Sequence, residues 1–364
     1  MSRKFLTLIL IAVVLVITAG CSHNLDKDGN YNGLCRLYDC RVQYGTLDLT
    51  YGHNLLFSYE NMEYTYLCAI PGCNHGIGTN CPAAEKTGKE FVRYGKHYWF
   101  CRDDKVVDEK IVYYLKLMSS DVTGENEHTV CTVKNYTIQS MDIGDFVTEC
   151  DRIYFIALLK TEEATENRLC SIELTSGRFK EICSFGEGDF SYSLLGLFDN
   201  KLFLSNGTYF DMRSNSFGKN DNISRTGYYI IRDGYYGYYD DADFVVLKED
   251  GKEIRVPDVA SMDIFRDNRI TLFDDRLFVS VDSEKPYYVR LNSEDNRKNY
   301  YDSGIDTSGY YYVYVHDEYK DNLILVGYTS VEDIPPQDGV YYSVDYVPTY
   351  YKIPKSQIYG EEVS

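Results

Sequence analysis

Three cysteines and one histidine lie within one stretch of 14 residues, namely Cys68, Cys73, His75 and Cys81. Pro71 and Gly72 suit the two central positions of a type II turn, which would bring the two flanking thiols toward one point. Three thiolates and one imidazole make a complete tetrahedral ligand set for structural zinc, with no position left open for a substrate. The spacing therefore predicts a metal site that supports the fold.

The same thiols could instead form disulfides. A bridge across the short loop from Cys68 to Cys73 would stabilise the fold by about 2 kcal/mol on the chain-entropy model. Zinc in small Cys/His sites contributes about 10–16 kcal/mol. This difference in stabilisation explains why a short loop would use a metal. Zinc, disulfides and a set of inert thiols nevertheless all remain alternatives for the cluster.

A second pair of cysteines flanks a predicted hairpin. Cys170 and Cys183 lie symmetrically about Ser176-Gly177. In a two-residue hairpin with Thr175 opposite Arg178, they would face one another with Cα atoms about 4.5 Å apart, at the short end of the disulfide range. If the glycine sits in a G1 bulge, the register slips and the thiols face opposite sides of the sheet. A disulfide is expected only in the first register.

The N-terminus has the layout of an export signal. A short basic segment precedes Phe5–Gly20, an uncharged, mostly apolar run of 16 residues, which is shorter than the ~20 residues of a membrane-spanning helix. Ile17–Cys21 resembles the lipobox of bacterial lipoproteins, although Thr18 stands where that family usually has Leu. The resemblance implies cleavage before Cys21 and a fatty-acylated (diacylglyceryl, palmitate-type) lipid on its thiol. An uncleaved anchor is the alternative, and both place the chain outside the cytoplasm at the cell membrane.

The elements that must position these residues repeat along the chain. A turn residue and a polar residue lead into a short apolar, often aromatic run. These segments begin at His53, Lys96, Asp151, Asn200, Asp233, Asp275 and Asp321. Their mean spacing of about 45 residues is typical of β-propeller blades, each a four-stranded sheet. We therefore expect an all-β fold, a single β-propeller of about seven blades, with six or eight blades or a β-sandwich of tandem hairpins as alternatives.

The expected organisation has three parts. Residues 1–20 are the signal peptide, residues 21–34 a lipidated flexible tether, and residues 35–364 the propeller domain with the Cys/His cluster at 68–81. Because a ring of blades must hide its edges, Cys40–Tyr44, or its continuation to Thr50, is expected to pair with the blade begun near Asp321.

The cluster also carries a family resemblance. The pattern Leu-Cys-x4-Cys-x-His-x5-Cys-x-Ala behind a lipobox resembles uncharacterised propeller-like lipoproteins of clostridial bacteria. The matching residues are Cys68, Pro71, Cys73, His75, Cys81 and Ala83. The resemblance covers the N-terminal hundred residues and implies a fold and a location, with no assigned activity.

Composition limits the partners. The net charge of −19 disfavours nucleic acid and direct docking on anionic headgroups, so the lipid anchor is the expected link to the membrane. The chain has 37 tyrosines, whose amphipathic rings suit packing between blades as well as a binding surface for a protein or glycan ligand.

No catalytic residue is assigned. The sequence contains no nucleophile elbow, P-loop, His-Glu-x-x-His motif or dinucleotide-binding glycine fingerprint. We expect a membrane-anchored extracytoplasmic binding or scaffolding lipoprotein of unknown ligand. The alternatives are an extracellular enzyme that acts on glycan or peptide in a propeller channel, and a sensory subunit of an envelope complex.

Overall fold

The computed structural model is nearly all-β, with a single five-residue helix, α3 (Lys355–Tyr359), among the described residues. The structure describes residues 33–35, 40–42, 45–50, 53–75, 81–84, 90–93, 96–138, 146–161, 164–187, 193–220, 229–232, 234–240, 243–257, 259, 270–280, 285–293, 297–310, 312–330 and 346–360.

Most of the described strands fall into seven successive antiparallel groups, which are called the first to seventh sheets below. The third and fifth groups belong to one ten-stranded sheet, and β8 (Lys105–Val107) and β9 (Lys110–Val112) form a separate two-stranded sheet. The first three contain β2 (Cys40–Val42), β3 (Gly45–Thr50), β4 (His53–Ser58) and β5 (Glu63–Tyr66); β6 (Glu90–Arg93), β7 (Lys96–Arg102), β10 (Tyr114–Asp121) and β11 (His128–Lys134); and β13 (Phe146–Glu149), β14 (Arg152–Lys160), β15 (Thr165–Glu173) and β16 (Phe179–Glu187). The next two contain β17 (Leu194–Phe198), β18 (Lys201–Leu204), β19 (Thr208–Asp211) and β20 (Ser216–Lys219); and β21 (Tyr229–Arg232), β22 (Tyr235–Asp240), β23 (Asp243–Lys248) and β24 (Glu253–Val256). The last two contain β25 (Ile270–Phe273), β26 (Arg276–Val279), β27 (Tyr287–Arg290) and β28 (Asn299–Tyr300); and β29 (Tyr312–Tyr319), β30 (Asn322–Ser330) and β31 (Tyr346–Pro354).

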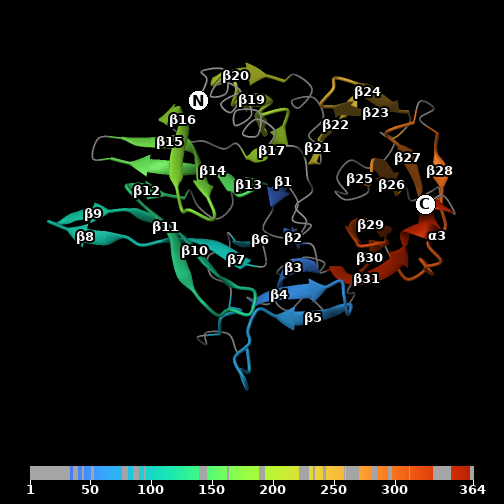
Figure 1. Cartoon of the computed structure of the whole chain (residues 1–364), viewed down its shortest axis with the longest axis horizontal. Coiled ribbons are helices and arrows are strands. Elements are labelled where there is room, and N and C mark those ends of the chain that lie inside the picture. Colours follow the sequence, from blue (N-terminus) through green and yellow to red (C-terminus); the bar gives the residue numbers. More distant parts are fainter. Residues whose placement is uncertain are drawn as a thin grey trace, which may run out of the picture.

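The sheets are arranged around a common centre, with the first strand of each nearest the middle (Figure 1). A short strand, β1 (Gly33–Cys35), lies there and pairs with both β13 and β21, which joins the third and fifth sheets into one hydrogen-bonded unit. β12 (Tyr136–Thr137) adds to β14. The chain preceding the first sheet therefore contributes a strand to the centre.

Tight turns explain the recurring segments. In the fourth sheet, Asp199 and Asn200 have φ of 49° and 58° between the paired residues Phe198 and Lys201, as a type I′ turn requires. Asp274 and Asp275 repeat this geometry with φ of 48° and 53°. Six of the seven segments contain the start of the second strand of a sheet, and the His53 segment is the third strand of the first sheet. The turns before β14 and β30 have one positive φ each, at Cys150 (46°) and Lys320 (54°). The predicted segments therefore follow tight turns with positive φ at four of these starts.

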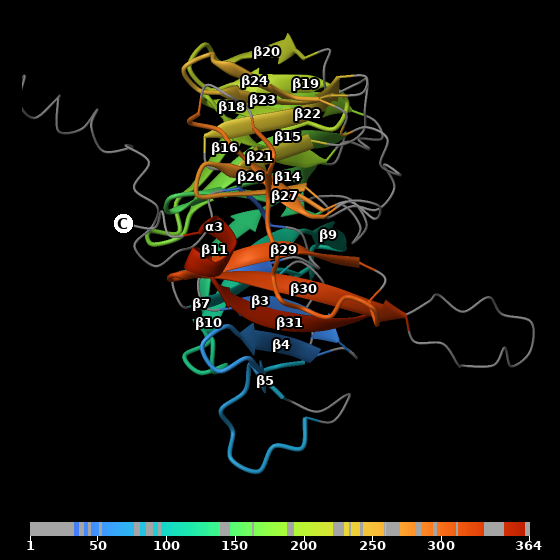
Figure 2. The ribbon, with the colours of Figure 1, turned by 90° about the vertical axis from the view of Figure 1, so that its right-hand side faces the viewer.

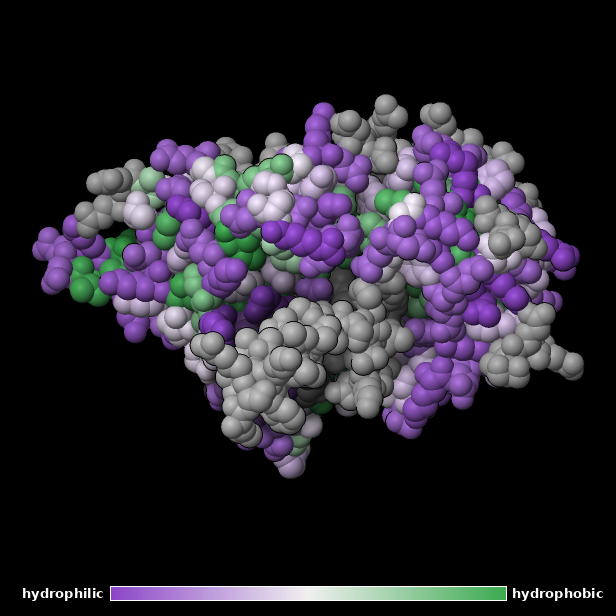
Figure 3. Space-filling view, turned by 45° about the horizontal axis from the view of Figure 1, so that its top comes forward, coloured by the Kyte–Doolittle hydropathy of each residue, from purple (hydrophilic) through white to green (hydrophobic). Residues whose placement is uncertain are grey.

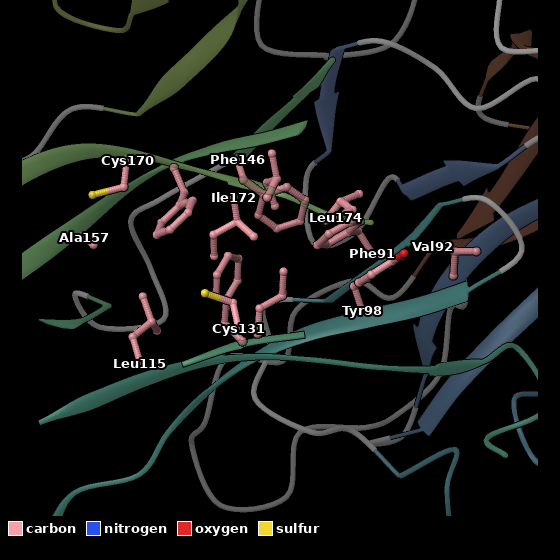
Figure 4. Packing of buried hydrophobic residues seen from close by; sticks show 14 of the residues in the cluster. Phe91, Val92, Tyr98, Leu115, Cys131, Phe146, Ala157, Cys170, Ile172 and Leu174 are labelled. Atoms are coloured by element: carbon pink, nitrogen blue, oxygen red, sulfur yellow. The ribbon is translucent and has the colours of Figure 1, made fainter. Parts of the chain in front are cut away.

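Apolar side chains from adjacent sheets form the cores between them. Between the second and third sheets, Phe91 packs against Phe146 with ring centroids 4.8 Å apart, and Phe100 against Phe155 at 4.9 Å. Cys170 is buried in the same cluster (Figure 4). A strand that is buried on both faces has apolar residues at successive positions. The apolar, aromatic segments of the sequence are therefore the buried strands.

The first and seventh sheets meet through side chains. Phe57 of β4 stacks on Tyr350 of β31 at 4.2 Å, and the Lys352 ammonium donates to the backbone carbonyl oxygen of Tyr59 at 2.7 Å. Figure 2 shows β31 beside β4. The expected strand pairing between these sheets is wrong: β2 pairs with β3, and β3 with β4. Described residues give the seventh sheet three strands, none from the N-terminal segment.

The C-terminal helix fastens the seventh sheet to the sixth. Ile358 and Tyr359 of α3 are buried among residues of both sheets. The Lys355 ammonium lies 2.6 Å from the Asp274 carboxylate and 2.9 Å from that of Glu318. A short helix too small to be stable alone is held by this packing.

The expected export signal lies outside the described residues, as do Cys21 and most of the expected tether. Within the described ranges, no helix has the length and apolar character that a membrane crossing requires.

Candidate metal centre

The Cys/His cluster is held at the outer edge of the first sheet, where the chain leaves β5. Leu67 is buried directly after the strand, and the Cys68 amide donates to the Tyr66 carbonyl oxygen at 2.7 Å. The Ala69 amide then donates to the carbonyl oxygen of Thr123, in the turn between β10 and β11, at 2.9 Å. The cluster therefore lies against the second sheet as well as the first.

The turn that brings the thiols together has the predicted form. Gly72 has a φ of 74°, and the Cys73 amide donates to the carbonyl oxygen of Ile70 at 3.2 Å. A positive φ at the third position is the signature of a type II turn and explains why a glycine follows Pro71. This local prediction is confirmed.

The four predicted ligands converge. One ligand atom from each of Cys68, Cys73, His75 and Cys81 lies within 4.8 Å of all the others. In a zinc tetrahedron with Zn–S bonds of about 2.3 Å, sulfur atoms are about 3.8 Å apart, so only a small contraction around an ion is needed. His75 Nδ1 is already 3.3 Å from Cys81 Sγ. The three thiols are unbonded to one another.

The donor chemistry selects among metals. Thiolate and imidazole ligands suit zinc and other soft or borderline ions, whereas manganese, magnesium and calcium prefer carboxylate and carbonyl oxygens. The set of three sulfurs and one nitrogen fills a tetrahedron, so the cluster is suited to supporting structure and leaves no coordination position for catalysis. The residues present could hold a metal of the zinc type.

The thiols differ in electrostatic environment. A hydrogen bond from the His75 backbone amide lowers the pKa of Cys73, whereas burial raises the pKa of Cys81 to about 11. A metal ion takes its cysteine ligands as thiolates, so it would displace the proton that burial favours on Cys81.

Two features fix the orientation of the imidazole. His75 adopts a left-handed backbone conformation with a φ of 49°, which is uncommon for a residue other than glycine. The Tyr66 ring stacks on the imidazole with centroids 4.0 Å apart and planes 13° from parallel. Partners that orient a ligand histidine are a regular part of metal sites. The sequence alone did not indicate this role for Tyr66.

The predicted face-to-face pair of Cys170 and Cys183 is wrong. Cys170 lies opposite Glu181, whereas Cys183 lies opposite Leu169 after a register shift. Gly177, with a φ of 67°, donates its amide to the Glu173 carbonyl oxygen and closes a longer turn than the two-residue one. Both thiols are unbonded, and they belong to clusters on opposite sides of the third sheet. The outcome resembles the bulged alternative.

Sequence reasoning missed a buried pair of a carboxyl group and an imidazole in the second sheet. His97 Nε2 lies 2.6 Å from Glu90 Oε2, and both side chains are almost completely buried. Arg93, also buried, donates from Nη1 to Thr148 of the third sheet at 3.3 Å. The only signal was the presence of polar residues in otherwise apolar strands. A carboxylate and an imidazole at this distance could exchange a proton, but their burial favours a structural role.

No protein-family model and no curated protein matches the sequence. Among solved structures, an oligogalacturonate lyase in complex with manganese is similar at 9% identity and a TM-score of 0.41, over 89% of this chain and 90% of that one. The β-propeller domain of the trilobed protease from Pyrococcus furiosus is similar at 12% identity and 0.34, over 74% and 90%. TolB from Acinetobacter baumannii is similar at 12% and 0.29, over 75% and 72%. These similarities concern the fold alone and assign no activity.

Proposed function

We propose that this protein is an extracytoplasmic lipoprotein whose seven-bladed β-propeller acts as a binding or scaffolding module. The anchor is the lipid on Cys21, and the binding surfaces lie on the outer rim. A structural zinc ion in the Cys/His cluster rigidifies one part of that rim.

The distribution of exposed apolar side chains carries this proposal. Of the eight large hydrophobic residues exposed in the described chain, six gather in two places on the rim. One group lies on β5 and in the turn after it, and the other occupies a hairpin of β8 (Lys105–Val107) and β9 (Lys110–Val112). The six residues are Tyr64, Tyr66 and Ile70 in the first group, and Val106, Val107 and Ile111 in the second. Gathered exposed apolar residues mark interaction sites, whereas single ones do not.

The hairpin is built to project. It extends from the rim between β7 and β10 (Figure 1), and Figure 3 shows hydrophobic residues at this protruding end. Val106 is 75% exposed and Ile111 58%, and the two are cross-strand partners on one face. An ion pair of 2.6 Å between Asp103 and Lys116 ties the root of the hairpin to β10. An apolar arm that projects from the rim suits a protein contact.

The centre of the molecule supports the choice of the rim over a channel enzyme. β1 lies among the innermost strands, where it pairs with β13 and β21. The acid–imidazole pair of Glu90 and His97 is buried between sheets. The exposed apolar residues named above thus lie outside the centre, which supports the rim as the site of binding.

The test is capture of partners from native membranes. Wild-type protein is compared with the double variant Val106→Ser/Ile111→Ser and with Tyr300→Ser, which removes an exposed ring outside both groups. We expect specific partners to be lost only with the hairpin variant. Identical captured proteins from all three would refute the scaffolding role of the hairpin.

A further inference from the structure

We infer that the rim beside the metal centre is a carbohydrate-binding site that takes a neutral oligosaccharide on the rings of Tyr64 and Tyr66. This inference rests on the proposed binding function and adds a ligand class to it. Sugars are recognised when the C–H groups on one face of a pyranose stack on an exposed aromatic ring, while hydroxyls bond to neighbouring polar groups.

The two rings are presented side by side on one face of β5. Tyr64 and Tyr66 are 43% and 41% exposed, and residues two apart on a strand point the same way, about 7 Å apart. β5 is the outer strand of the first sheet, and all four of its residues are exposed. The platform is therefore open to a ligand from outside the ring of sheets.

Each of the two tyrosine rings is held in position by a second ring that packs against it. Phe57 meets the Tyr64 ring edge-on at 4.9 Å and itself stacks on Tyr350. The Tyr66 ring lies flat on the His75 imidazole at 4.0 Å. Preorganised rings lose little conformational entropy on binding, and a metal on His75 would hold the second ring in place.

Size and charge select the ligand. The two exposed rings offer roughly 200 Å² of aromatic surface, well below the ≈ 800 Å² per partner of a standard protein interface. The net charge of −19 disfavours an anionic sugar, and the tyrosine hydroxyls can themselves donate hydrogen bonds to sugar hydroxyls. A neutral oligosaccharide meets both conditions.

Calorimetric titration of the full chain tests this inference. The neutral probes are the hexasaccharides of cellulose, xylan and chitin, and the anionic probe is hexagalacturonate. We expect at least one neutral probe to bind with a Kd of about 1 mM or tighter, and the anionic probe not to bind. Tyr66→Ala should weaken binding about tenfold or more, and Tyr66→Phe should retain it within about threefold because the ring remains. Tyr300→Ala is the control that should bind like wild type.

A second comparison tests the histidine of the metal centre. Oligosaccharide binding by His75→Ala is compared with binding by His128→Ala, which replaces an exposed histidine outside the cluster. Only the first should weaken oligosaccharide binding, since only His75 backs the Tyr66 ring. The inference is overturned if no neutral probe binds, if Tyr66→Ala binds like wild type, or if sedimentation shows a dimer that Tyr66→Ala abolishes. Its failure leaves the proposed scaffolding role standing if the hairpin variant still loses captured partners.

Discussion

The Tyr59 hydroxyl donates a hydrogen bond to the Asp317 carboxylate at 3.0 Å, across 258 residues of sequence. Asp317 is fully buried, and its other carboxylate oxygen accepts from the Glu318 amide at 2.8 Å. This bond joins the residue after β4 of the first sheet to β29 of the seventh, and the described residues of these two sheets share no strand. The junction therefore depends on individual side chains.

Replacement of Tyr59 by Phe should weaken the junction. The variant leaves a buried carboxylate without one of its donors, and we expect the free energy of unfolding to fall by about 1–3 kcal/mol. Urea denaturation followed by fluorescence measures the change. Tyr64→Phe, at an exposed ring, should stay within about 0.5 kcal/mol of wild type. Equal stability of both variants would argue against the junction.

The metal centre predicts a stoichiometry. Elemental analysis of purified protein should find about one zinc per chain, and His75→Ala should lose most of it because three thiolates then have no fourth protein donor. His128→Ala should keep the metal. Protein without metal and without reactive thiols at the cluster would favour the disulfide alternative instead.

The register of the third sheet predicts separate thiols. Cys170 is buried, and burial raises its pKa strongly; burial also raises the pKa of Cys183 to about 11. Because the thiolate is the reacting form, native protein at pH 8 should alkylate slowly at both and much faster at the exposed Cys150. After unfolding, all should react. A Cys170–Cys183 disulfide in peptide maps of unreduced protein would contradict the observed register.

The C-terminal clamp predicts a pH dependence. Burial opposes ionisation of Asp274, but the hydrogen bond and charge of Lys355 prevail and hold its pKa below the ordinary value. Such a carboxyl stabilises the fold fully above its unfolded pKa of about 3.9, and the stabilisation is lost as the pH falls through the lower folded value. Lys355→Met should therefore destabilise by about 1–3 kcal/mol at pH 7, and the difference should shrink below about pH 4.

A matched control for the clamp is Lys320→Met. Its pair with Glu60 is exposed on both sides, so its removal should change the free energy of unfolding by less than about 1 kcal/mol at either pH. Thermal unfolding at pH 7 and pH 3 provides the comparison. A pH-independent loss in Lys355→Met would mean that the contribution of Lys355 is packing alone.

Lipid attachment is tested separately from the fold. Cys21→Ala should abolish incorporation of a labelled fatty acid and release protein from the membrane fraction, because the proposed lipid is attached through that thiol. Cys150→Ala serves as the control and should label like wild type. Equal label in Cys21→Ala and wild type would refute the anchor.

The sequence by itself determined the features that depend on neighbouring residues. Pro71-Gly72 predicted the turn that gathers the ligands, because a type II turn is closed by a hydrogen bond between residues three apart. The recurring segments predicted the strand starts, because a tight turn with positive φ favours Asp, Asn or Gly wherever it occurs. The all-β class and the Cys/His cluster needed no knowledge of distant contacts.

Only the tertiary structure decided the relationships between distant segments. The turn at Gly177 left the register open in the sequence, and the structure has Cys170 opposite Glu181 and Cys183 opposite Leu169, with the two thiols in different cores. Pairing of Tyr59 with Asp317 and stacking of Tyr66 on His75 had no local signal. The free energy of such contacts depends on which surfaces the whole chain buries together, and a sequence pattern of short range does not contain that information.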